Sequence, residues 1–372
     1  MNSLFAACAP GLEPLVASEL AALGVKDIHP TEGGVGFAGE HREMALANNL
    51  LGCASRVLLR LGAFHAAAFP ELRRKAAALP WDTVLTPGAP MALRVTAHKS
   101  RLFHSGAIAE RVAGAVADAL GKESPVEKSA EDAEDVTAQT IIVRMHRDEC
   151  TISADSSGAL LHRRGYRQAT GKAPLRETLA CAMLAAAGWK PGEALLDPFC
   201  GSGTIILEAA RMASGMPPGI RRNFAFISWP RMPGDILFGI NGGPAVPTPI
   251  AGSDINHGAL AAARANAERA AFSQAVQISR GDAVDITPHA PTGLILTNPP
   301  YGHRVGDSNE LHALFAAFGR NLRARFGGWR VAMLTTDDAL IRSTGLLLKP
   351  VLKTSNGGLR VTLHLGQVDQ AG

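Results

Sequence analysis

The sequence predicts a doubly wound, mostly parallel α/β sheet over residues 190–372, preceded by an α+β region. Two observations support this fold class. From residue 190 onward, short apolar runs alternate strictly with helical stretches, which is typical of parallel strands joined by right-handed helical crossovers. Before about residue 155 the two kinds of segment occur without strict alternation, which indicates a separate α+β fold.

The composition is that of a globular protein. The chain has 372 residues, of which 47% are hydrophobic and 19% charged, and a length of ~100–200 residues per domain predicts two or three domains. It has no run of ~18 apolar residues and no basic start typical of a secretion signal, so we expect a cytoplasmic protein without a membrane span. The net charge of +4 permits a polyanionic partner without requiring one. The sequence carries no signal of oligomeric state.

The five cysteines lie far apart in the sequence. They form no CxxC pair and no Cys/His cluster at the spacing of metal ligands. We therefore expect reduced thiols and no metal site. The cysteines are Cys8, Cys53, Cys150, Cys181 and Cys200.

The expected elements follow the pattern of apolar residues. In the first part, strands are expected at SLFAA, GVGFAG, RVLLRLGAF, MALRVTA and TIIVRM, and helices at GLEPLVASELAALG and IAERVAGAVADAL. In the second part, strands are expected at EALLD, PIAGSD, VQISRGD, GLILTNPP and WRVAMLT, with helices between them such as TIILEAARMA. Ligands of such parallel sheets bind where the strands end at their carboxyl side.

The first of these strand ends is a glycine-rich turn, DPFCGSG. Gly201 and Gly203 allow a tight turn and a close approach of a ligand to the backbone, and Asp197 ends the strand. A phosphate-binding P-loop would need a Lys at the start of the following helix, which is absent here. A dinucleotide-binding turn would have a third glycine where Ile206 stands. A P-loop and a dinucleotide-binding turn are therefore both disfavoured interpretations of this turn.

The next two strand ends each carry an aspartate. Asp254, in GSDIN, is placed to accept hydrogen bonds from the hydroxyls of a ribose, although it could equally cap the helix that follows. Asp282, in RGDAVD, can reach an exocyclic amine or can be an ordinary turn carboxylate. Residues 214–249, rich in Pro and Gly, form an insertion before Asp254. The insertion either contacts the substrate or has no role in function.

The fourth strand end is TNPPYG. Two prolines after Asn298 cannot continue a strand, but they can hold a side-chain oxygen, a backbone carbonyl and the ring of Tyr301 rigidly together. A glycine turn, two aspartates and Asn-Pro-Pro-Tyr at successive strand ends together describe a nucleoside site beside a reacting amine.

The densest basic stretch of the chain lies between the two parts. It contains Arg163, Arg164, Arg167, Lys172 and Arg176 with Tyr166 among them, and no acidic residue before Glu177. An aromatic residue among positive charges is suited to a sugar-phosphate strand with unstacked bases. A solvated linker between domains is the alternative interpretation.

The motifs together resemble a known family. DPFCGSGT with SDIN, GDA and TNPPYG resembles the class I S-adenosylmethionine-dependent amino-methyltransferases. The whole chain resembles the THUMP-domain RNA guanine N2-methyltransferases, and most of all the first half of a large-ribosomal-RNA enzyme whose bacterial form can carry a second methyltransferase domain. This chain ends before such a domain, so the second activity is not implied. His303 stands where many relatives have an acidic residue.

The resemblance implies a domain order and a cofactor site. We expect a ferredoxin-like unit at residues 1–60, an RNA-binding THUMP domain at 61–157, a basic linker at 158–189 and a Rossmann-like methyltransferase domain at 190–372. The implied cofactor is S-adenosylmethionine and the implied partner is RNA, bound through Arg163, Arg164, Tyr166, Arg167 and Lys172. The implied cofactor-binding residues are Asp197, Phe199, Cys200, Gly201, Ser202, Gly203, Thr204, Asp254, Ile255, Asp282, Ala283 and Asn298.

The catalytic residues implied are Asn298, Pro299, Pro300 and Tyr301. The side-chain oxygen of Asn298 and the carbonyl of Pro299 would accept hydrogen bonds from the target amine, while Tyr301 stacks on a base extracted from the RNA. A covalent mechanism through Cys200 would need an activated thiolate near the base, whereas this cysteine lies in the turn expected to face the cofactor.

Several rival functions share parts of this pattern. DNA adenine and protein glutamine methyltransferases also use NPPY, and a transfer-RNA acceptor-stem guanine is an alternative to a guanine of 23S ribosomal RNA. A non-catalytic RNA-binding module would be expected to have lost Asp254 or Asn298, and both are present.

Overall fold

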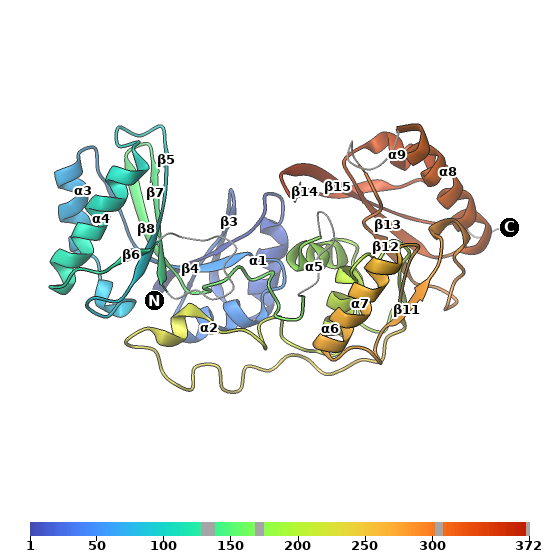
Figure 1. The fold of residues 1–372 in the computed structure, drawn as a ribbon, viewed down its shortest axis with the longest axis horizontal. Coiled ribbons are helices and arrows are strands. Elements are labelled where there is room, and N and C mark those ends of the chain that lie inside the picture. Colours follow the sequence, from blue (N-terminus) through green and yellow to red (C-terminus); the bar gives the residue numbers. More distant parts are fainter. Residues whose placement is uncertain (128–137, 168–174, 302–307, 370–372) are drawn as a thin grey trace. The chain divides into compact units, whose positions relative to one another are not determined.

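The computed structural model describes residues 1–127, 138–167, 175–301 and 308–369 (Figure 1). The strands in this part of the chain form two sheets, one in each of two structural units. Unit 1 comprises residues 1–8, 16–161 and 222–240. Unit 2 comprises residues 9–15, 162–221 and 241–372. In the described part of the chain, no helix is both long and apolar enough to cross a membrane.

Unit 1 is built on an eight-stranded sheet with the strand order β2-β3-β1-β4-β8-β7-β5-β6. Most neighbouring strands are antiparallel, but β5 pairs in parallel with both β6 and β7. The strands are β1 (Asn2–Ala7), β2 (Lys26–Thr31), β3 (Gly34–Gly39), β4 (Arg56–His65), β5 (Met91–His98), β6 (Val126–Glu127), β7 (Gln139–His146) and β8 (Glu149–Asp155). The helices in this part of the chain are α1 (Glu13–Ala22), α2 (His41–Leu50), α3 (Phe69–Ala77), η1 (Trp81–Thr83) and α4 (Ser105–Leu120).

Local sequence explains the ends and faces of these elements. In α4, Ile108, Val112 and Val116 recur at helical spacing and are buried, and the helix ends at Gly121, whose φ of 72° suits a glycine. The strands β7 and β8 are joined by a two-residue turn, Arg147 and Asp148, in which both φ angles are positive. The expected α+β region is confirmed.

The middle of the segment inserted at residues 214–249 belongs to unit 1. Its short helix η2 (Ala225–Ser228) buries Phe226 completely, and the backbone N–H of Phe226 donates to Ser156 O at 3.1 Å. The indole of Trp229 donates to Gln139 Oε1 at 2.7 Å. Residues 224–229 are therefore packed into unit 1, whereas most of residues 230–239 are exposed.

Unit 2 contains a seven-stranded sheet with the order β11-β10-β9-β12-β13-β15-β14. The first five strands in this order are parallel, and the β14–β15 hairpin adds two antiparallel strands at one edge. The strands are β9 (Leu195–Asp197), β10 (Ile250–Asp254), β11 (Gln277–Arg280), β12 (Leu294–Thr297), β13 (Arg330–Thr335), β14 (Lys349–Asn356) and β15 (Leu359–Gln367). The helical elements are α5 (Glu177–Ala186), α6 (Thr204–Ala213), α7 (His257–Ala270), η3 (Ala283–Asp285), α8 (Ser308–Arg325) and α9 (Asp338–Ser343).

The core of unit 2 follows from the apolar spacing of α8. Phe315, Phe318 and Leu322 lie three or four residues apart and pack with Trp329 against the sheet. The strand β9 lies between β10 and β12. The chain first adds β10 and β11 on one side of β9 and then adds β12 and β13 on the other side. Such a switch point opens a crevice at the carboxyl ends of the strands. The expected doubly wound, mostly parallel fold is confirmed.

Candidate active site

Four chain segments of the candidate site meet at the carboxyl edge of the sheet in unit 2. The strands β9, β10, β11 and β12 run parallel and are adjacent, so the residues that follow them lie along one edge. Asp197 and Asp254 are the last residues of β9 and β10. Asp282 follows β11, and Asn298 follows β12 directly. The structure thus brings together the strand ends that the sequence singled out.

The turn after β9 has the geometry expected of a ligand-binding loop. Gly201 and Gly203 have φ angles of +53° and +87°, which L side chains rarely adopt. A side chain added at Gly201 would meet no atom within 4 Å, so the space beside it is open. Gly203 precedes the buried Thr204 at the start of α6, and the carbonyl of Ser202 accepts a hydrogen bond from Asn266 Nδ2 at 3.0 Å.

Asp197 is buried beneath this turn. Its carboxylate accepts hydrogen bonds from Thr297 Oγ1 at 2.7 Å and from Phe199 N at 3.1 Å. Burial raises the pKa of Asp197 to about 7, and the nearby charge of Asp254 adds to the rise, while the two hydrogen bonds oppose it. The carboxylate therefore holds the turn to the end of β12. The ring of Phe199 packs edge-on against Phe318.

Asp254 organises the same turn from the neighbouring strand. One oxygen accepts from Gly201 N at 2.9 Å and the other from Asn256 N at 2.8 Å. The helix cap of α7 is Asn256, whose side chain accepts from Ala259 N at 3.1 Å. The alternative interpretation of Asp254 as the cap is therefore wrong. Because each carboxylate oxygen has a second lone pair, Asp254 can accept further hydrogen bonds from a ligand. Beside it, the apolar side chain of Ile255 is 59% exposed.

Asp282 lies at the third strand end. Its side chain is exposed and accepts a hydrogen bond from Val284 N at 3.1 Å, as an ordinary turn carboxylate does. Ala283 is buried at the start of η3. This geometry agrees with the interpretation of Asp282 as an ordinary turn carboxylate. It also leaves the carboxylate accessible at the carboxyl edge of the sheet.

The fourth strand end presents an acceptor without a partner. Asn298 Oδ1 is buried and has no hydrogen-bond partner among the described residues. Pro299 is buried and Pro300 partly so. The hydroxyl of Tyr301 accepts a hydrogen bond from Asn356 Nδ2 at 3.1 Å, and burial raises the pKa of Tyr301. His303 lies outside the described residues.

Cys200 is packed rather than reactive. Its backbone N–H donates to Ser253 O at 3.0 Å, and its side chain fills the space beside Gly252. Burial raises the pKa of the Cys200 thiol far above its usual range, with the charges of Asp197 and Asp254 adding to the rise. A thiolate nucleophile is therefore disfavoured at this position. All five cysteines are buried and free of disulfides.

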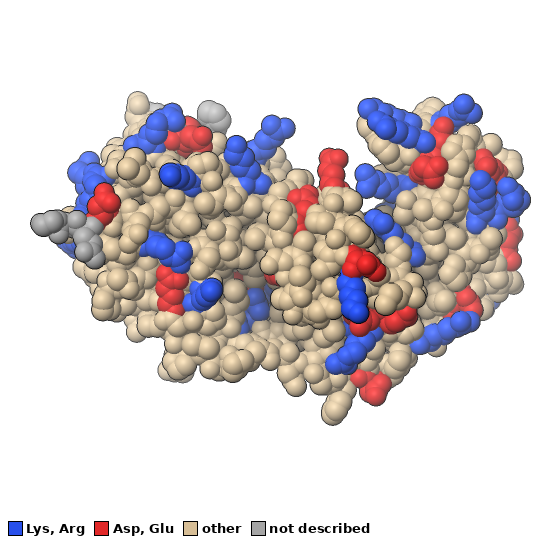
Figure 2. All heavy atoms as spheres, turned by 180° about the vertical axis from the view of Figure 1, so that it is seen from behind, with Lys and Arg blue, Asp and Glu red and all other residues tan. Residues whose placement is uncertain are grey.

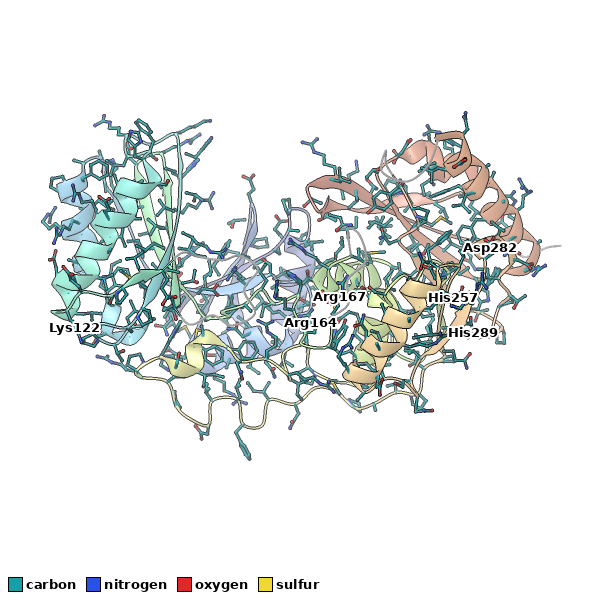
Figure 3. All side chains as sticks on the ribbon, viewed as in Figure 1. Lys122, Arg164, Arg167, His257, Asp282 and His289 are labelled. Carbon is teal, nitrogen blue, oxygen red and sulfur yellow. The ribbon has the colours of Figure 1, made fainter. Side chains whose placement is uncertain are left out.

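The basic segment departs from the prediction. Arg164 and Tyr166 are only 3% and 4% exposed, and the Tyr166 hydroxyl donates to Glu208 Oε1 at 3.0 Å. Arg167 donates to Glu177 Oε1 at 3.3 Å, and its side chain is 9% exposed. Figure 3 shows Arg164 and Arg167 lying close to α5. The prediction that these three side chains bind RNA is therefore wrong, because they are enclosed in unit 2.

Glu208 is the centre of this buried network. It forms an ion pair with Arg211 at 2.9 Å and accepts a hydrogen bond from Cys181 Sγ at 2.9 Å. Burial acts to raise the pKa of Glu208, but Arg211 and Arg164 outweigh it and lower the pKa. Of the other two residues predicted to bind RNA, Arg163 is half-buried and Lys172 lies outside the described residues.

Two polar residues of the site had no signal in the motifs. Thr297 precedes the Asn-Pro-Pro-Tyr segment and hydrogen-bonds to Asp197, and Asn356 in the β14–β15 hairpin binds Tyr301. Within the described residues, no group of three or more His, Cys, Asp or Glu side chains is placed to hold a metal ion.

Comparison with family models covers three parts of the chain. Residues 164–361 match the RMKL-like methyltransferase domain. The chain belongs to the RMKL-like methyltransferase family. Residues 3–58 match the RlmL ferredoxin-like domain, and residues 66–155 match the THUMP domain. The expected family is confirmed.

Individual relatives of this RMKL-like methyltransferase match nearly its whole length. A Synechocystis protein named "Putative RNA methyltransferase slr0064" is 33% identical over 96% of this chain and 95% of its own. A structure titled "Crystal structure of SMU.472, a putative methyltransferase complexed with SAH" has a TM-score of 0.89 and 26% identity, covering 100% of this chain and 99% of its own. A structure titled "predicted N6-adenine-specific DNA methylase" from Listeria monocytogenes has a TM-score of 0.85 and 30% identity, covering 97% and 95%.

Proposed function

We propose that this protein transfers a methyl group from S-adenosylmethionine to the N2 amine of a guanine in 23S ribosomal RNA. The coarser part of this statement rests on the family: the chain is an S-adenosylmethionine-dependent RNA methyltransferase with a THUMP domain. The guanine and the ribosomal target are the finer part. Both are supported by the sequence resemblance, and the chemistry of the Asn298 segment supports a planar nitrogen as the methyl acceptor.

The cofactor is S-adenosylmethionine, and the residues of the carboxyl edge fit it. The open space beside Gly201 admits a ligand close to the backbone. Asp254 has lone pairs free for ribose hydroxyls, and the exposed side chain of Ile255 offers an apolar surface to an adenine. Asp282 is exposed at the next strand end, within the same edge, and can accept from an exocyclic amine. When bound, the cofactor supplies an electrophilic methyl group.

The observation that carries the proposal is the unpartnered oxygen of Asn298. Guanine N2 is conjugated with the ring and is a poor nucleophile, so its lone pair must be drawn out of the ring plane. Asn298 Oδ1 has no hydrogen-bond partner among the described residues and follows β12 at the same edge as Asp254. Together with the carbonyl of Pro299, it can accept both amine protons, and preorganised acceptors of this kind act mainly in the transition state.

The remaining residues of the segment hold the base and the acceptors. The ring of Pro300 fixes the backbone, and Tyr301 offers an aromatic face to a base extracted from the RNA. A strong general base is not needed, because the amine loses an acidic proton once it is methylated. The raised pKa of Tyr301 keeps its hydroxyl neutral, so the stacking face carries no charge.

An experiment on RNA can test both parts of the proposal. In-vitro transcripts of 23S ribosomal RNA and of transfer RNAs, which carry no modifications, are incubated with the protein and S-adenosylmethionine, digested and analysed by nucleoside mass spectrometry. N2-methylguanosine in the 23S transcript is the expected product. N2-methylguanosine in transfer RNA alone would move the target to an acceptor-stem guanine, and N6-methyladenosine would overturn the assignment of the base.

A further inference from the structure

The chain segment that ends in the β14–β15 hairpin has no acidic residue of its own, and the carboxylate of Asp338, just before this segment, is ion-paired with His364 of β15 at 3.2 Å. From Ala339 to Val368 the chain contains Arg342, Lys349, Lys353 and Arg360 but no Asp or Glu. All four basic side chains are exposed. Among the described residues, no carboxylate forms an ion pair with Lys353 or Arg360. A surface with such a run of unneutralised cations is suited to a polyanion.

The hairpin tip reaches the edge that holds the candidate active site. Thr335, the last residue of β13, pairs with Thr362 of β15, so the tip extends beyond the carboxyl end of β13. The tip is a two-residue turn in which Gly357 and Gly358 have φ angles of +56° and +85°. At the base of this turn, Asn356 donates the hydrogen bond to Tyr301. The tip is therefore joined to the segment that carries Asn298.

One face of the hairpin points its cations outward. Lys353 pairs with Thr362, and Ser355 pairs with Arg360, so Lys353 and Arg360 share a face. The opposite face packs into unit 2 through the buried residues Leu352, Thr354, Val361 and Leu363. Figure 2, which is turned by 180° from Figure 1, shows Lys and Arg side chains projecting from the surface of the molecule.

We propose that the tip and the outer face of this hairpin, through Lys353 and Arg360, bind the RNA backbone beside the target nucleotide. This inference rests on the proposed function, because it assigns the RNA contact of the same site. A nucleotide extracted toward Tyr301 must have its flanking phosphates nearby, and phosphate contacts fix the register of a nucleic acid on a protein. Leu359 pairs with Asn356 and therefore lies on the face opposite to Lys353 and Arg360, on the side of the tip that contacts Tyr301. It is 51% exposed there and offers an apolar surface against which a base can pack.

The test compares two double variants of the whole chain. Lys353→Ala with Arg360→Ala removes the two cations of the hairpin face. Lys190→Ala with Arg320→Ala removes two other exposed cations of unit 2, so the change in net charge is the same. The affinity for an unmodified 23S ribosomal RNA transcript is measured at several salt concentrations, together with S-adenosylmethionine affinity, melting temperature and methyl-transfer kinetics.

For the hairpin variant, the slope of log RNA affinity against log salt concentration should become shallower by about two, because each lost phosphate contact lowers this slope by about one. Its RNA affinity at 0.15 M salt should fall by roughly 10- to 50-fold. Its KM for RNA should rise while its cofactor affinity and melting temperature stay those of the wild type, and the control variant should keep the wild-type slope. A wild-type slope in the hairpin variant, or equal losses in both variants, overturns the hairpin assignment while the wild type still methylates RNA. Wild-type protein that methylates no RNA overturns the proposed function itself.

Discussion

The side-chain amide of Asn356 donates a hydrogen bond of 3.1 Å to the hydroxyl of Tyr301. It joins the segment that follows β12 to the tip of the β14–β15 hairpin, two parts of the chain that are far apart in sequence. Tyr301 also packs against the hydrophobic core of unit 2. The ring expected to stack on the base is thus held at both its apolar face and its polar end.

We expect Asn356 to act as a positioning residue for Tyr301. Replacing either partner, in Asn356→Ala or Tyr301→Phe, should lower the methyl-transfer rate on RNA by roughly 2- to 12-fold, the equivalent of one hydrogen bond worth about 0.5–1.5 kcal/mol. The double variant should lose no more than either single variant, because both changes remove the same interaction.

The measurement is a double-mutant cycle on the single-turnover rate, with melting curves of all four proteins as the control for folding. Additive losses in the double variant would show that the two side chains act independently and would contradict the positioning role. Asn356→Gln, which keeps an amide, should recover part of the rate lost in Asn356→Ala.

Asp254 is expected to bind the ribose of the cofactor. Asp254→Ala should lower S-adenosylmethionine affinity by roughly 1.5–3 kcal/mol, because it removes a charged acceptor and also the hydrogen bond to Gly201. Asn256→Ala is the matched control, since it removes the cap of α7 and should cost about 1 kcal/mol of stability without changing cofactor affinity. Calorimetric titration of both variants measures this, and unchanged binding in Asp254→Ala would remove Asp254 from the cofactor site.

Asp197 should make stability depend on pH. Its pKa is raised to about 7 in the folded protein from an ordinary value of 3.8. Because the folded state binds this proton more tightly than the unfolded state, the stabilising contribution of Asp197 is complete below about pH 4 and is lost as the pH rises to about 7. Asp197→Asn keeps an oxygen acceptor for Thr297 but cannot ionise.

The free energy of unfolding of Asp197→Asn, measured by urea titration from pH 4.5 to pH 8, should therefore rise relative to that of the wild type as the pH rises. Taking the difference between the two proteins cancels the titration of groups that do not interact with Asp197. A difference that stays constant across this range would mean that Asp197 ionises at its ordinary pKa in the folded state.

The buried network around Glu208 should matter for stability and not for RNA binding. Tyr166→Phe removes the hydroxyl that donates to Glu208 and should cost about 1–3 kcal/mol of unfolding free energy. The RNA affinity should stay at the wild-type value, because Tyr166 is enclosed in unit 2. A lower RNA affinity in a variant with an unchanged melting temperature would restore the RNA-binding interpretation of this segment.

The strand ends could be predicted from the sequence because their signals are local. A glycine turn after an apolar run, an aspartate at the next strand end and prolines after Asn298 each determine backbone geometry within a few residues. Parallel pairing then places them at one edge without further information. The alternative interpretation of Asp254 as a helix cap missed the helix start by two positions, since Asp254 and Asn256 are both good caps by residue type and only the helix start separates them.

The basic segment could not be predicted because only the packing of two later helices brings its carboxylate partners beside it. Arginines at positions 164 and 167 look exposed until Glu208 and Glu177 are placed beside them by the packing of α5 and α6. The link from Asn356 to Tyr301 is of the same kind, since a hairpin tip gives no local sign of what it contacts. Long-range polar contacts are thus where the sequence pattern alone was insufficient.

The central claim is that Asn298 polarises the target amine, and the most direct test is the single-turnover rate of methyl transfer by Asn298→Ala on unmodified 23S ribosomal RNA. The variant should keep its melting temperature, its S-adenosylmethionine affinity and most of its RNA affinity, because the hydrogen bond from the amine matters chiefly in the transition state. Its rate should fall by roughly 10²–10³-fold, as when one preorganised hydrogen-bonding group is removed from an active site. A folded Asn298→Ala protein that transfers methyl groups at the wild-type rate would contradict the mechanism.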